Sequence, residues 1–158
     1  MDVLWHELSA GMPDRAHLAI VVIRFIAAVL LGGIVGIQRE KVGKPAGLRT
    51  HMLVSLGTAV VVLACSSGGM DMDGLSRVIQ GIVTGIGFVG AGAILKLTDQ
   101  REIQGLTTAA GLWMTAAIGV AVGLGELGLA VIGTVLTVVV LALEGLEVAW
   151  NKRREKSK

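Results

Sequence analysis

The chain has 158 residues and a formal net charge of +2, and its composition is 53% apolar with 23 glycines. In an ordinary soluble domain apolar residues and glycine together make up about 45–50%, so this chain is too apolar for that class. Charged residues contribute only 16% and fall in short clusters between long uncharged stretches, which indicates lipid as the solvent. The length leaves no room for a separate soluble catalytic domain.

The first 17 residues contain no basic region ahead of an apolar run, so we expect an extracytoplasmic N-terminal segment without a cleavable signal peptide. Five later stretches reach or approach the length of a membrane-spanning helix, about 17–25 residues. They are Leu18 to Ile37, His51 to Ser67, Val78 to Leu95, Leu106 to Leu124 and Leu127 to about Val148. The sequence predicts an all-α, polytopic membrane bundle of five transmembrane helices over residues 18–148, followed by a basic cytoplasmic tail over 149–158.

The distribution of basic residues predicts the orientation of the bundle. Eleven of the 14 lysines and arginines lie between spans one and two, between spans three and four, or in the tail. Only Arg15 and Arg77 lie on the other side. Because Lys and Arg accumulate in cytoplasmic loops, we expect the N-terminus outside and the C-terminus in the cytoplasm.

Small residues indicate how the helices associate. Lipid tails are as apolar as leucine, so helices in a bilayer depend on close backbone approach, which small residues one turn apart permit. Spans one, three and four each contain a GxxxG pair, and span three is so rich in glycine that we expect it to lie centrally. The predicted packing glycines are Gly32, Gly36, Gly81, Gly85, Gly87, Gly90, Gly92, Gly119 and Gly123.

A faint internal repeat relates residues 47–50 (GLRT) to residues 105–108 (GLTT), and the same offset of 58 residues maps Gly32 onto Gly90. A true duplication would give two helical hairpins in parallel orientation, as in some transporters. Chance similarity between segments of like composition is the alternative, and the shortness of the match favours it.

Arg24 lies inside the first span, where an arginine costs at least about 2.5–3.5 kcal/mol on insertion scales. Such a side chain either faces protein or water, or extends to the headgroups. Thr84 of span three falls at a similar depth, and Gln80 lies just outward of it. We therefore expect a buried polar contact between spans one and three.

A second polar group gathers at the cytoplasmic ends of the spans. On a structural interpretation, Thr50 and Thr108 cap helix starts and Glu40 forms an interfacial ion pair with Arg39 or Arg49. On a functional interpretation, the same groups form a polar mouth for an ion, a lipid headgroup or a protein partner. The candidate binding residues are Arg24, Gln38, Arg39, Glu40, Arg49, Thr50, Gln80, Thr84, Thr107 and Thr108.

Catalytic signatures are missing from the sequence. The three histidines are far apart along the chain, and no CxxC or HExxH occurs. Residues 85–90 match GxGxxG in letters, but they lie inside a span with no preceding strand. We expect no metal, no cofactor, no catalytic residues and no nucleic-acid partner.

Residues 32–40 with 46–51, residues 85–92 and residues 105–113, in this order, resemble the MgtC/SapB family of bacterial inner-membrane proteins. The resemblance implies a multi-pass protein of the bacterial cytoplasmic membrane linked to growth under magnesium limitation. In some members it implies virulence inside host cells through inhibition of the membrane ATP synthase. Gln38 stands where family members usually carry Glu. With no soluble C-terminal domain after the basic tail, the chain is similar to the short, SapB-like branch.

Two classes of function remain after these exclusions. The first is a regulator of magnesium homeostasis that docks its glycine-rich helices against another membrane protein complex or a second copy of itself. The alternative is a small ion or solute transporter or channel, which Arg24, the internal repeat and the polar mouth would support. An enzyme is not expected, and the lipid bilayer is the one certain partner of such a chain.

Overall fold

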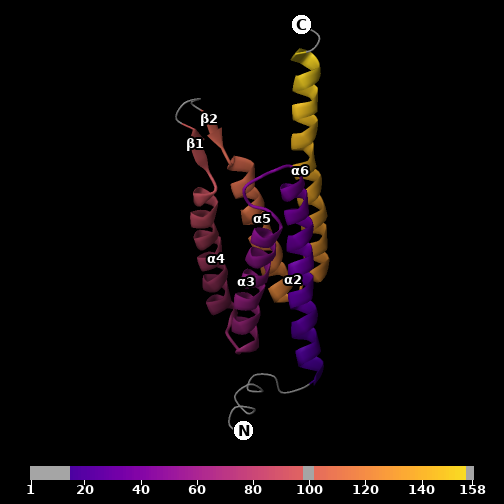
Figure 1. Ribbon diagram of the computed structural model, residues 1–158. Helices are drawn as coiled ribbons and strands as arrows, with labels where there is room; N and C mark the ends of the chain where they lie inside the picture. Colours follow the sequence, from indigo (N-terminus) through magenta and orange to yellow (C-terminus); the bar gives the residue numbers. More distant parts are fainter. Residues whose placement is uncertain (1–14, 98–101, 156–158) are drawn as a thin grey trace, which may run out of the picture.

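The computed structural model describes residues 15–97 and 102–155, and the side chains of residues 16–94 and 104–143. The described chain forms five long helices and one short antiparallel hairpin (Figure 1). In chain order the elements are α2 (Arg15–Lys41), α3 (Leu48–Ser67), α4 (Met72–Gly92), β1 (Leu95–Leu97), β2 (Glu102–Gln104), α5 (Leu106–Leu124) and α6 (Leu127–Glu155). The all-α bundle predicted from sequence is confirmed. The hairpin was not predicted from the sequence.

Four of the described helices are long and apolar enough to cross a membrane, namely α2 from Ala16 onward, α3, α4 and α5. In α6 the apolar part within the described side chains is shorter, Leu127–Leu143, and the helix continues to Glu155 into the predicted basic tail. The chain is therefore a multi-pass membrane protein. The fifth crossing and the orientation remain predictions, and residues 1–14 of the predicted N-terminal segment lie outside the described residues.

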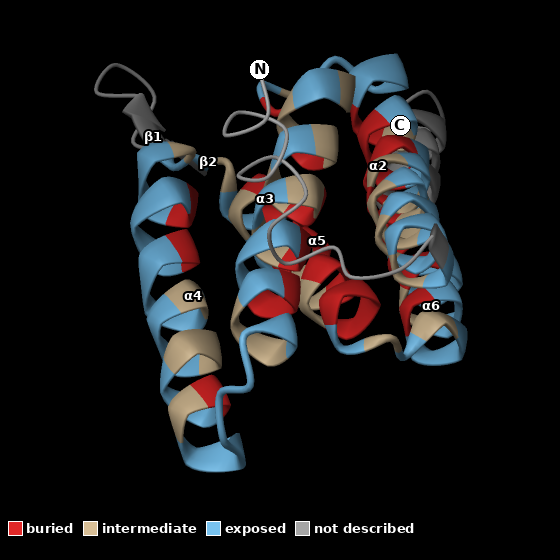
Figure 2. Cartoon of the chain, turned by 90° about the horizontal axis from the view of Figure 1, so that it is seen from below, coloured by how far each residue is buried: buried red, intermediate tan, exposed pale blue. Residues whose placement is uncertain are grey.

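Helix α5 lies at the centre of the bundle. It packs against α2, α3, α4 and α6, and 56% of its apolar window is buried, against 17% for α4. Figure 2 shows the same contrast, with buried residues gathered on α5 and exposed residues over most of α4. The prediction that the third span lies centrally was wrong, because α4 packs on one side only, against α5 and less extensively α3.

Glycine pairs bring α3 close to α2 and to α5. A Cβ at Gly32 would lie 2.6 Å from the His51 carbonyl oxygen. A Cβ at Gly36 would lie 2.6 Å from the Cα of Leu48, and one at Gly123 would lie 2.8 Å from the Cβ of Val62. These backbones approach as closely as GxxxG spacing in the first and fourth spans predicts.

Most glycines of α4 behave differently. Gly81, Gly85, Gly87 and Gly92 have no atom within 4 Å of where a Cβ would stand, and only Gly90 of this set packs, 3.4 Å from the Cβ of Ala109. Within the described residues, the four open glycines make none of the helix contacts predicted for them. GxxxG spacing shows that a helix can approach another one closely, but it does not show on which side.

The internal repeat finds support in the helix register. Gly32 packs against His51 at the start of α3, and Gly90 packs against Ala109 at the start of α5. The offset of 58 residues maps the first pair onto the second. The hairpins α2–α3 and α4–α5 thus share a contact in the same register, as duplication would produce.

Candidate functional site

Arg39, near the C-terminal end of α2, is fully buried at 0% exposure. Its Nη2 donates to Oγ1 of Thr108 at 3.3 Å, and Thr108 lies in the first turn of α5 and is 1% exposed. The two helices are far apart in sequence, and this bond joins them inside the bundle. Burying a guanidinium costs free energy unless its N–H groups find acceptors. The bond to Thr108 is therefore a structural part of the α2–α5 contact.

His51, Ser55 and Thr115 extend the same buried cluster, and none of them is among the candidate binding residues chosen from the sequence. His51 and Thr115 are both fully buried, and the His51 Nδ1 lies 2.7 Å from the Thr115 Oγ1. Thr115 donates its single hydroxyl hydrogen to the Gly111 carbonyl at 2.9 Å, and on that ground we assign the imidazole proton to the His51 Nδ1, which donates in the shorter contact. Polar residues four apart on α3, His51 and Ser55, were the signal that could have found this cluster.

Two buried acceptor positions in this cluster have no hydrogen-bond partner within the described residues. They are the His51 Nε2, which is an acceptor in this tautomer, and the Ser55 Oγ. Buried polar groups in native proteins are almost always paired with protein or ordered water. The polar interior between α2, α3 and α5 therefore has unused hydrogen-bonding capacity.

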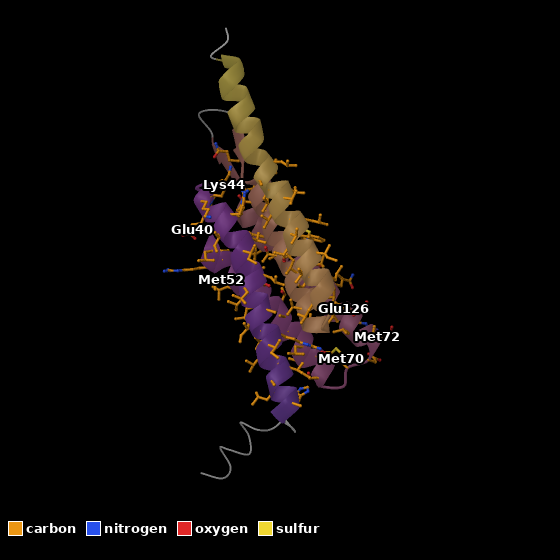
Figure 3. The ribbon with its side chains drawn as sticks, turned by 90° about the vertical axis from the view of Figure 1, so that its right-hand side faces the viewer. Glu40, Lys44, Met52, Met70, Met72 and Glu126 are labelled. Carbon is orange, nitrogen blue, oxygen red and sulfur yellow. The ribbon has the colours of Figure 1, made fainter. Side chains whose placement is uncertain are left out.

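Gln38 and Glu40 bond to the backbone of neighbouring helices. The Gln38 Nε2 donates to the Leu141 carbonyl of α6 at 3.1 Å. The Glu40 Oε2 accepts from the backbone N–H of Leu48 at 2.9 Å, so the carboxylate caps α3 from the end of α2. Figure 3 shows Glu40 and Lys44 at one end of the bundle and Met70, Met72 and Glu126 at the other.

The remaining candidates from the predicted polar mouth lie at the edge of this cluster. Arg49 and Thr107 are exposed and Thr50 is half-buried. The capping role that the structural interpretation gave to Thr50 and Thr108 is wrong, because the N-cap positions of α3 and α5 are Gly47 and Gly105, which have no side chain to form a cap bond. Both helices begin earlier than the threonines, and Thr108 instead accepts from Arg39.

Arg24 contacts the C-terminal end of α5, at the opposite end of the bundle from Arg39 and Glu40. Its Nη1 donates to the Gly123 carbonyl at 3.0 Å, one of the carbonyls left free at the C-terminus of α5. The predicted contact with span three was wrong, because Gln80 and Thr84 are exposed on α4, where the Thr84 Oγ1 donates to the Gln80 carbonyl at 2.9 Å. Arg24 thus fixes the tight turn that leads into α6.

Two recesses between helices are lined almost entirely by apolar groups. One of about 270 Å³ lies between α5 and α6, beside Gly111, Met114 and Leu136. Another of about 110 Å³ lies between α4 and α5, beside Ile82, Ile86 and Trp113. Neither is lined by Arg39 or His51, so neither opens onto the buried polar cluster.

Residues 25–147 match the MgtC family. This chain belongs to the MgtC family. It is 39% identical over 145 residues to Protein SrpB of Synechococcus elongatus, a match that covers 82% of this chain and 79% of SrpB. The resemblance found in the sequence is confirmed, and no solved structure matches the chain.

Two further relatives of this MgtC-family chain are longer proteins. The putative magnesium transporter YhiD of Escherichia coli is 42% identical over 127 residues, which are 76% of this chain and 58% of YhiD. Protein MgtC of Salmonella typhimurium is 39% identical over 125 residues, 79% of this chain and 52% of MgtC. The chain thus spans little more than half the length of these two relatives.

Proposed function

We propose that this MgtC-family chain is a non-catalytic regulator in adaptation to low magnesium, placed in the bacterial cytoplasmic membrane. It acts through contacts with other membrane proteins. Family membership and the relatives named for MgtC and for magnesium transport support the link to magnesium. The mode of action rests on the surface of α4.

One observation carries the contact mechanism, namely the uncovered glycine face of α4. Gly81 and Gly85 have open space above their backbones, and Phe88, one turn further along, is 85% exposed. In lipid, bare helical backbone is the surface against which another helix packs most closely. The bundle leaves that surface free while it uses the glycines of α2 and α5 internally.

A transporter is the second candidate, and the buried polar cluster favours it. Intramembrane charges such as Arg39 often mark ion pathways, and YhiD carries the name of a putative magnesium transporter. The His51 Nε2 and the Ser55 Oγ, which lack hydrogen-bond partners within the described residues, would be able to bond to the water around a hydrated solute. Against this candidate, all three side chains are fully buried in this structure.

Reconstitution of the purified chain into liposomes separates the two candidates. The liposomes contain a magnesium-sensitive dye. If the chain is a regulator, magnesium should enter them no faster than it enters protein-free liposomes, at either sign of membrane potential. Faster magnesium entry that is lost in the Arg39→Gln variant and kept in the Gly57→Ala variant would reject the regulator and establish a transporter. Gly57 is a suitable control because it is exposed and has open space around it.

A further inference from the structure

The outer face of α4 carries an amide within the candidate membrane span of that helix. Gln80 lies eight residues beyond Met72, the first residue of the helix, which is about 12 Å along the axis at ~1.5 Å per residue. Its side chain is exposed, and it has no hydrogen-bond partner within the described residues. Since lipid tails offer no hydrogen bonds, a protein partner with polar groups at this position would stabilise the amide.

Opposite charges lie on the same face, closer to the start of the helix. Asp73 and Arg77 are one turn apart, and both are exposed. Neither forms an ion pair with any residue in the described part of the chain. A helix that covers this face would match it by offering a cation near Asp73, an anion near Arg77 and an amide or its equivalent near Gln80.

We propose that α4 of a second copy of this chain covers this face, in a parallel dimer about a two-fold axis along the membrane normal. Two copies inserted in the same direction place identical residues at the same depth, so Gln80 meets Gln80. Each amide offers both a donor and an acceptor, and the pairing is reciprocal. Asp73 of each copy lies within one turn of Arg77 of the other, which makes the charged end complementary to itself.

The apolar part of the face fits the same symmetry. An isologous interface brings one surface against an identical one, so a protruding residue must find a hollow on its own copy. Phe88 protrudes at 85% exposure, and Gly85 and Gly92 beside it present bare backbone. Each Phe88 ring can lie over the glycines of the opposite helix while the two backbones approach closely.

This inference rests on the proposed function, because it takes the face assigned there to protein contact and names its occupant. The dimer would be the form that regulates.

Cysteine cross-linking in membranes tests the occupant. In a Cys65→Ser background, Thr84→Cys places a thiol on the proposed axis, and Leu136→Cys places one on the exposed face of α6, where Leu136 is 59% exposed. Mild oxidation should give a covalent dimer with Thr84→Cys and only the background level with Leu136→Cys. Equal cross-linking at the two positions would reject a second copy as the partner of α4.

The dissociation constant of the dimer provides a second test. It is measured by fluorescence energy transfer between copies of the purified full chain in lipid as the protein is diluted with more lipid. Gln80→Leu should raise the dissociation constant roughly three- to twentyfold, the range that interhelical hydrogen bonds in membranes provide. Gln80→Asn should retain most of the affinity. A chain that stays monomeric at every dilution, or a dimer indifferent to Gln80→Leu, would overturn the proposal.

The two proposals fail separately. If the chain is monomeric in pure lipid but Gly85→Leu still abolishes support of growth at low magnesium, another protein covers α4, so the second copy is rejected and the proposed function stands. If the dimer forms as described but its loss leaves such growth unchanged, the dimer stands and the proposed function fails.

Discussion

The His51 Nδ1 and the Thr115 Oγ1 lie 2.7 Å apart, both in fully buried side chains on adjacent helices. Because the Thr115 hydroxyl donates to Gly111 of its own helix, it serves at once as donor and acceptor. The bond joins α3 to the central helix α5 at the level where Gly32 of α2 packs against the His51 backbone. Three helices therefore depend on the placement of one imidazole.

Replacing Thr115 by valine should destabilise the bundle. The shape is preserved, but the His51 Nδ1–H loses its acceptor inside the core, which costs about 1–3 kcal/mol. The check is the unfolding free energy in mixed micelles under a denaturing detergent. Thr115→Ser should stay close to the wild type, and a Thr115→Val variant as stable as the wild type would refute the assigned bond.

Arg24→Gln should weaken the α5–α6 turn. The variant loses the bond from the Arg24 Nη1 to the Gly123 carbonyl, and hydrogen bonds that involve charged groups contribute about 1.5–3 kcal/mol. Proteolysis near Gly125 in micelles reports the turn directly and should become faster. Unchanged cleavage would show that Arg24 extends to the headgroups and leaves the helix end alone.

Gly119→Ala should disrupt the packing of α5 on α3. A Cβ at this position would collide with the Ser55 carbonyl and the Thr58 hydroxyl, and overpacking of this kind typically costs about 1–3 kcal/mol. Gly57→Ala is the matched control, since its Cβ meets open space and alanine favours the helix. Equal thermal midpoints for the two variants would contradict the close approach.

Glu40→Ala should loosen the first turn of α3. The Leu48 N–H would lose its only side-chain acceptor in the described structure, and loss of such a cap costs about 0.5–2 kcal/mol. Hydrogen exchange of the Leu48 amide should accelerate, while Glu40→Gln, which keeps an acceptor oxygen, should change it less. If the Leu48 amide exchanges as slowly in Glu40→Ala as in the wild type, the carboxylate does not cap α3.

The helices of this chain were predictable from sequence because hydropathy over about twenty residues is a strong signal. The span from Leu106 to Leu124 agrees with α5 residue for residue. The start of α4 was placed six residues late, at Val78, because Asp73 and Arg77 interrupt the apolar pattern. In the structure Asp71 accepts from Gly74 N at 2.8 Å and caps the helix there.

Contacts between the helices were less predictable. The acceptor of Arg24 is the backbone carbonyl of Gly123, and a sequence does not show which backbone carbonyl is free to accept. Gly85 and Gly119 have the same local spacing, yet one faces open space and the other α3. Which face of a helix meets which neighbour depends on the whole bundle.

Growth at low magnesium of a strain that lacks its own copy of the protein tests the central claim most directly. The strain should be rescued by the wild-type chain and by Gly57→Leu, whose glycine is open and lies off α4. Gly85→Leu should insert at equal abundance and fail to rescue, because its side chain fills the contact surface of α4. Full rescue by Gly85→Leu would contradict action through that face.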